Sequence, residues 1–144
     1  MRVWQTFTYQ WRLAAVLVAL SIAFPTYGDN AINVSAKLLQ AEYLKEQGKL
    51  PQALNTLHAA RIAVPIKSRE HTLVMGMIAN IHILQRRYDE AFLVLTETQP
   101  LAEKNGWHLI AADQASFLAN LFQRKVNTEK ALRWYEKTRQ LAEK

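Results

Sequence analysis

The sequence predicts an all-α protein, and three observations support this prediction. From Ser35 onward, apolar residues recur every three or four positions, which is the spacing of an amphipathic helix. No segment alternates strictly between apolar and polar residues, as a half-buried strand would. Glycine, proline and helix-capping residues interrupt the helical pattern at intervals. The 144 residues are 50% hydrophobic and include no cysteine, so we expect one ordered domain without disulfides or thiolate metal sites.

Residues 1–28 have the layout of a secretory signal peptide. Residues 1–12 carry two arginines and no acid, and residues 13–24 contain no charge. A helix of these uncharged residues would be about 18 Å long, which is shorter than the ~30 Å hydrocarbon layer of a membrane. We therefore expect export to the periplasm or another extracytoplasmic space, with cleavage after Gly28 and a mature domain at residues 29–144. A membrane anchor, formed by an uncleaved signal, is the alternative.

The charge pattern argues against a nucleic-acid partner. The chain has 18 basic and 12 acidic side chains, but Arg2 and Arg12 belong to the predicted signal. The other charges are mixed in sign along the predicted helices, as on solvated helix faces, and form no basic stripe. Binding to phosphates needs clustered basic side chains. We therefore expect no nucleic-acid partner.

Six helices are expected, and most boundaries carry a local signal. Gly48 follows the first helix, and Pro51 suits the first turn of the second, where the missing N–H of proline costs nothing. Pro65 ends the second helix because the residue before a proline is pushed out of the helical conformation. Ser68 can cap the third helix, and Asn127 can cap the sixth. The expected helices span residues 35–47, 51–64, 69–86, 89–105, 108–124 and 128–143.

The fourth predicted helix contains an internal proline. Inside a helix, Pro100 has no N–H to donate and crowds the carbonyl group of Thr96. We therefore expect a kink or an early end at Pro100. Asn105 and Gly106 form an ordinary stop signal after this helix.

The predicted helices pair into three similar segments. Three alanines lie 38 and 40 residues apart: Ala53, Ala91 and Ala131. Another alanine precedes each of them by twelve residues: Ala41, Ala79 and Ala119. A large side chain lies four residues after Ala53, Ala91 and Ala131, respectively: Leu57, Leu95 and Tyr135. Small residues on two antiparallel helices let the backbones approach closely, and the large residue fills the space beside the contact.

This arrangement resembles the tetratricopeptide repeat. Residues 46–65 (EQGKLPQALNTLHAARIAVP) and 86–95 (RRYDEAFLVL) carry most of the match, which covers residues 33–144. The period near 40 resembles the variant whose second helix is extended. The resemblance implies a right-handed α-solenoid of three antiparallel hairpins, at about residues 34–67, 68–106 and 107–144. An unrelated six-helix bundle is the alternative.

The sequence contains no motif for catalysis or for metal or cofactor binding. Its four histidines are scattered, and none has a second ligand at metal-binding spacing. His82 occupies the repeat position of Leu44 and Phe122, so we expect a packed histidine there. There is no G-x-S-x-G motif and no glycine-rich phosphate loop. We therefore expect neither enzymatic activity nor a cofactor or bound metal.

The resemblance also implies a concave binding groove. In such stacks, the first helices of the pairs line the groove, and the residue eleven positions before the aligned alanine points into it. These residues are Glu42, Asn80 and Asn120. Ser116 and Arg124 share a helix face with Asn120, and Gln123 lies beside it. Asparagine offers a donor and an acceptor, and arginine a bidentate fork, which suit a peptide backbone or carboxylate.

The expected function is therefore that of an exported scaffold or adaptor that binds a protein or peptide. Further apolar contacts are expected from Ile83, Leu84 and Tyr43, and Gly76 leaves room for a ligand side chain. Two alternatives remain. Trp134 and Leu141 on the last helix have no evident cover and would make an oligomerising module that contacts a second copy or another protein. The chain could instead be a sensor segment, related to the signalling proteins that contain such repeats.

Overall fold

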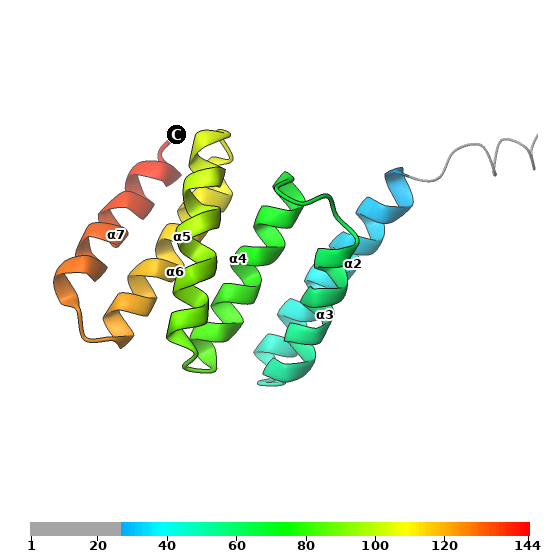
Figure 1. Cartoon of the computed structure of the whole chain (residues 1–144), viewed down its shortest axis with the longest axis horizontal. Helices are drawn as coiled ribbons and strands as arrows, with labels where there is room; N and C mark the ends of the chain where they lie inside the picture. The colour runs from blue at the N-terminus through cyan, green and yellow to red at the C-terminus, as the bar shows by residue number, and fades with distance from the viewer. Residues whose placement is uncertain (1–26) are drawn as a thin grey trace, which may run out of the picture. The chain divides into compact units, whose positions relative to one another are not determined.

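The computed structural model describes residues 27–144, and these form α-helices without a strand (Figure 1). The predicted all-α class is therefore confirmed. Residues Val34–Lys144 form one compact unit, separate from Met1–Asn33. None of the described helices combines the length and apolar character needed to cross a membrane. The helices are α2 (Tyr27–Glu46), α3 (Leu50–Ile62), α4 (Arg69–Leu84), α5 (Tyr88–Lys104), α6 (His108–Arg124) and α7 (Thr128–Ala142).

Local capping signals account for most helix boundaries. From α3 to α7, each helix begins and ends within two residues of the expected position. The N–H of His71 donates to Ser68 Oγ at 3.0 Å, and the N–H of Lys130 donates to Asn127 Oδ1 at 3.1 Å. Both predicted N-caps are therefore confirmed. Pro51 lies in the first turn of α3, as expected.

The first described helix begins earlier than expected. α2 begins at Tyr27, eight residues before the start of the apolar pattern. No proline interrupts this stretch, so helical hydrogen bonding continues beyond the amphipathic face. Most of the predicted signal peptide, residues 1–26, lies outside the described residues, and the expected cleavage position after Gly28 falls in the first turn of α2.

The helix that contains Pro100 does not end early, so that part of the expectation is wrong. α5 continues through Pro100 to Lys104. Pro100 and Thr96 are both exposed, so the carbonyl group that loses its helical donor can bond to water instead. Solvent access thus removes much of the cost of a proline inside this helix.

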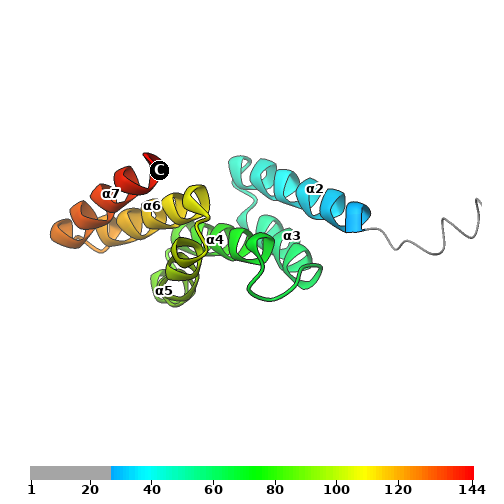
Figure 2. The same ribbon diagram turned by 90° about the horizontal axis from the view of Figure 1, so that it is seen from above.

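Within the unit Val34–Lys144, successive helices run in opposite directions, and their connections lie at alternate ends (Figure 1). Each helix from α4 to α7 packs against its predecessor, and α4 also packs against α6. Figure 2 shows the same helices from above. The first, third and fifth described helices, α2, α4 and α6, supply most of the residues that line the pocket of this unit.

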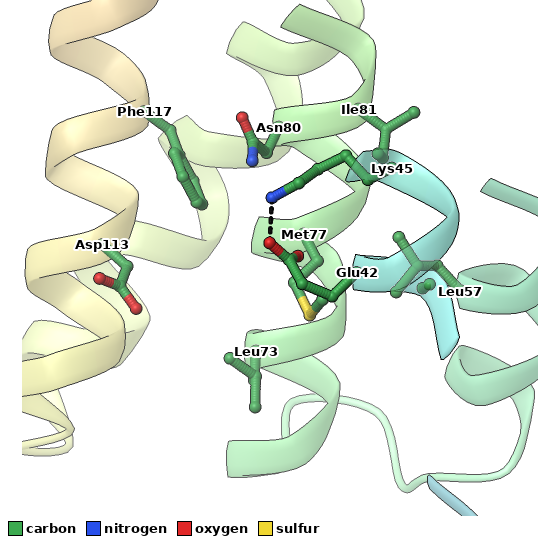
Figure 3. A pocket seen from close by; sticks show the side chains of 10 residues that line it. Glu42, Lys45, Leu57, Leu73, Met77, Asn80, Ile81, Asp113 and Phe117 are labelled. Carbon is green, nitrogen blue, oxygen red and sulfur yellow. Dashed lines mark hydrogen bonds and ion pairs between the residues drawn. The ribbon is translucent and has the colours of Figure 1, made fainter. Parts of the chain in front are cut away.

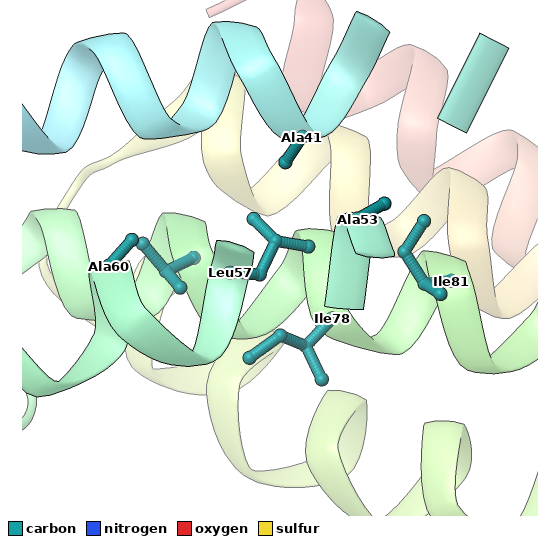
Figure 4. Packing of buried hydrophobic residues seen from close by; sticks show 7 residues of the cluster. Ala41, Ala53, Leu57, Ala60, Ile78 and Ile81 are labelled. Atoms are coloured by element: carbon teal, nitrogen blue, oxygen red, sulfur yellow. The ribbon is translucent and has the colours of Figure 1, made fainter. Parts of the chain in front are cut away.

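The alanines of the repeat pattern are all buried, with at most 4% of their surface exposed. Ala41 and Ala53 share a cluster with Leu57, and Figure 4 shows Ala41 of α2 directed toward α3. Ala79 and Ala91 share a second cluster with Leu95. Tyr135 differs from Leu57 and Leu95, because it is exposed and its hydroxyl group donates to Gln123 Oε1 at 2.8 Å.

A left-handed turn recurs with the same period as the alanines. Gly48, Arg86 and Val126 have φ angles of 71°, 63° and 58°, and each lies five residues before an aligned alanine. In each turn, the next residue donates its N–H to a carbonyl group five positions back, at 2.9, 2.8 and 2.8 Å. This is the Schellman hydrogen-bond pattern that ends helices. The backbone therefore repeats even where the sequence has no glycine.

Replacing Val126 with glycine is expected to raise the free energy of unfolding by about 1 kcal/mol. Val126 is β-branched and 86% exposed, so its side chain contributes little packing while it strains the left-handed backbone. Urea unfolding followed by circular dichroism measures the difference. The reverse change at the equivalent turn, Gly48→Val, is the matched control and should be destabilising. A Val126→Gly variant that is less stable than the parent chain would contradict the presence of backbone strain at Val126.

Candidate functional site

A pocket of about 350 Å³ opens between α2, α4 and α6 (Figure 3). The α4 residues Leu73, Met77 and Asn80 are three or four positions apart, and so are Asp113 and Phe117 on α6. Such spacing places each set on one helix face. The residues that line the pocket are Ala41, Glu42, Lys45, Leu57, Leu73, Met77, Asn80, Ile81, Asp113 and Phe117.

The pocket combines apolar side chains with a few polar groups. Lys45 Nζ and Glu42 Oε1 form an ion pair, and Figure 3 shows this pair beside Asn80. Asp113 extends from α6 on the other side, next to Phe117. Asp113 is exposed as a residue, but partial desolvation of its carboxyl group raises the pKa of that group. Among the described residues, no basic side chain forms an ion pair with Asp113.

Two of the six predicted groove residues line this pocket, namely Glu42 and Asn80. The other four lie on α6 but do not line it: Ser116, Asn120, Gln123 and Arg124. Arg124 Nε donates to Asn120 Oδ1 at 2.7 Å. The amide and guanidinium groups that were expected to hold a ligand are therefore bonded to each other, on an exposed part of α6 beyond the pocket.

Sequence reasoning missed several pocket residues, although the repeat pattern contained a signal for them. Leu73 and Asp113 both lie eighteen residues before an aligned alanine. Met77 and Phe117 both lie fourteen residues before one. The expectation started from the position eleven residues before the alanine and added only Ser116, Gln123 and Arg124 on the third repeat. Extending it by one and two helical turns toward the N-terminus would have found both equivalent pairs.

Gly76 does not leave room for a ligand side chain, so that expectation is wrong. The fully buried Gln114 of α6 lies against Gly76, and its Nε2 donates to the carbonyl oxygen of Thr72 at 2.8 Å. A Cβ atom at position 76 would lie 2.8 Å from that nitrogen. The space beside Gly76 is therefore used for packing between α4 and α6.

The structure also corrects several expected apolar contacts. Ile83 belongs to the buried cluster around Leu95 and does not face a groove. Tyr43 and Leu84 are exposed but do not line the pocket. Leu141 is 2% exposed and packs with a cluster from α5 and α6, so the expectation that it lacks cover is wrong. Trp134 is half-buried, with Lys137 Nζ 5.7 Å from its ring centre.

His82 is a packed side chain in this structure, with only 8% of its surface exposed. Burial is the main cause that lowers its pKa, and the positive charge of Arg87 acts in the same direction. The described residues contain no group of three or more His, Asp or Glu side chains that could hold a metal ion. Comparison with protein-family models, curated proteins and solved structures finds no match to this chain.

Proposed function

We propose that the chain is an exported scaffold or adaptor that binds a protein or peptide segment in the pocket between α2, α4 and α6. In this proposal, the helices form three tetratricopeptide-like hairpins, α2–α3, α4–α5 and α6–α7, stacked as a right-handed solenoid. The buried alanines, the recurring left-handed turns and the packing of α4 on α6 support this arrangement. Export rests on the layout of residues 1–28.

The binding proposal rests mainly on the repeat positions of the residues that line the pocket. Leu73 and Met77 of α4 and Asp113 and Phe117 of α6 occupy equivalent positions of two successive repeats. A peptide that lies across α4 and α6 would therefore meet equivalent positions on both helices. Stacked repeats commonly use such a shared face as an extended binding surface.

The chemistry of the pocket suits a peptide. The volume of about 350 Å³ is at the small end of ligand pockets and accommodates part of a peptide better than a large cofactor. Leu73, Met77 and Phe117 offer apolar contacts, and methionine adapts to different side chains because it is flexible. Asn80 makes no side-chain hydrogen bond within the described part of the chain, so its amide can pair with a ligand backbone.

The test is selection of peptides from a random displayed library on the immobilised chain, followed by affinity measurements on variants. Asn80→Trp should weaken binding of the selected peptides at least about tenfold, since the indole ring would occupy pocket space that an apolar side chain of the peptide needs. Asn55→Trp makes the same change at an exposed position of α3 outside the pocket and should leave binding unchanged.

Circular dichroism spectra and melting temperatures must show that both tryptophan variants remain folded. Equal peptide affinities for Asn80→Trp and the parent chain would contradict binding in this pocket. Failure to enrich any peptide on the parent chain would contradict the proposed function as a whole.

A further inference from the structure

We propose that the pocket selects a peptide segment with a basic side chain next to an apolar one. This inference rests on the proposed function, because it names the kind of peptide that the same pocket would take. Three features of the pocket support it: its uncompensated charge, the positions of its apolar side chains and the lack of a free cation on its walls.

The uncompensated charge of the pocket is negative. The ionisable side chains that line it are the carboxylates of Glu42 and Asp113 and the ammonium group of Lys45. Lys45 already pairs with Glu42. Asp113 has no cationic partner within the described chain. The pocket thus carries an unpaired carboxylate, although the whole chain has a formal net charge of +6.

The surroundings of Asp113 make a ligand cation favourable there. Asp113 remains exposed as a residue, but partial desolvation raises the pKa of its carboxyl group, and no basic side chain of the described residues offsets that effect. A carboxylate that has lost some of its hydration gains from a charge-assisted hydrogen bond. An arginine or lysine side chain of the ligand would supply the missing partner.

The pocket that contains Asp113 also offers apolar side chains for the stem of such a residue. Figure 3 shows Phe117 next to Asp113 on α6, and Met77 and Leu73 of α4 line the same pocket. Long basic side chains place their methylene groups on apolar surface and keep the charged head at a polar site. Arginine also stacks on aromatic rings and bonds carboxylates with two N–H groups, so we expect arginine to bind more tightly than lysine.

An acidic segment fits the same pocket poorly. A ligand carboxylate would approach Asp113, and the Lys45 ammonium group is already engaged by Glu42. Arg124, the basic side chain on the same helix as Asp113, lies outside the pocket and is bonded to Asn120. Repulsion between like charges therefore disfavours acidic ligands.

The experiment uses four fluorescein-labelled peptides that are identical except for one central residue. Two leucines flank this residue, which is arginine, lysine, glutamine or glutamate, and glycine and serine complete the peptide. Fluorescence anisotropy with the full chain should show the arginine peptide binding about threefold more tightly than the glutamine peptide, as expected for an ion pair to an exposed carboxylate. The glutamate peptide should bind most weakly. Because the preference is electrostatic, it should shrink at high salt.

Variants assign the preference to one carboxylate. Asp113→Asn should abolish the difference between the arginine and glutamine peptides while leaving the glutamine peptide within about twofold of its original affinity, because the apolar contacts remain. Asp113→Glu keeps the charge and should keep the preference. Asp89→Asn is the matched control, because Asp89 lies on α5 outside the pocket and pairs with Lys125, which follows α6. It should leave the preference unchanged.

The outcomes separate this inference from the proposed function. Equal affinity for all four peptides, tighter binding of the glutamate peptide, or a preference that survives in Asp113→Asn would each overturn the inference. Peptide binding in the pocket would stand in those cases. Failure of all four peptides to bind would also overturn the inference, and the library selection with Asn80→Trp then decides separately whether the pocket binds peptides at all.

Discussion

Replacing Leu141 with alanine is expected to lower the free energy of unfolding by about 3 kcal/mol. Leu141 lies near the end of α7, yet only 2% of its surface is exposed. It packs against Ala102 of α5 and Ile110 and Ala115 of α6. Truncation removes apolar contacts and leaves a cavity, because neighbouring helices relax only in part. Urea unfolding monitored by circular dichroism gives the change.

The same substitution elsewhere on α7 provides the control. Leu132 is 63% exposed, so Leu132→Ala should change the free energy of unfolding by no more than about 0.5 kcal/mol. Analytical ultracentrifugation of Leu141→Ala should give the same oligomeric state as the parent chain. A change in oligomeric state without a loss of stability would show that Leu141 contacts another molecule and would contradict its role in the core.

Replacing Gly76 with alanine is expected to destabilise the protein by about 2 kcal/mol, although alanine is the better helix former by about 1 kcal/mol. The added Cβ atom would lie 2.8 Å from Gln114 Nε2 and 3.0 Å from its Cγ atom. The amide must then move and lose its hydrogen bond to the Thr72 carbonyl oxygen, 42 residues away in sequence. A buried donor without a partner costs more than the gain in helix propensity.

A double-mutant cycle tests this explanation. In the Gln114→Ala background there is no amide to displace, so adding Gly76→Ala should raise the free energy of unfolding by about 1 kcal/mol, the helix-propensity difference. The sign of the Gly76→Ala effect therefore reverses between the two backgrounds. Equal effects in both backgrounds would show that Gly76 and Gln114 do not interact as the structure indicates.

The candidate site was predictable in part. Glu42 and Asn80 could be found because the repeat pattern assigns them equivalent positions on α2 and α4. Leu73, Met77, Asp113 and Phe117 were all missed, although they form two pairs at equivalent repeat positions. Leu73 and Asp113 differ in chemistry, and Met77 and Phe117 resemble ordinary core residues, so only their meeting in one pocket indicates a common role. Asn120 has an equivalent position as well, but it lies beyond the pocket.

Residues close in sequence were sufficient to define most helix ends. Ser68, Asn127 and Pro51 act through hydrogen bonds within one helical turn, so the helix ends from α3 to α7 follow from local chemistry. The burial of the repeat alanines also follows from their periodicity.

Contacts between distant residues decided the rest. Gln114 fills the space beside Gly76, α5 and α6 cover Leu141, and the pocket brings Asp113 across from Glu42. Each of these features depends on how far one helix lies from another and how it is rotated about its axis. Those quantities arise from the packing of all side chains in the interface, which no segment of the chain encodes by itself.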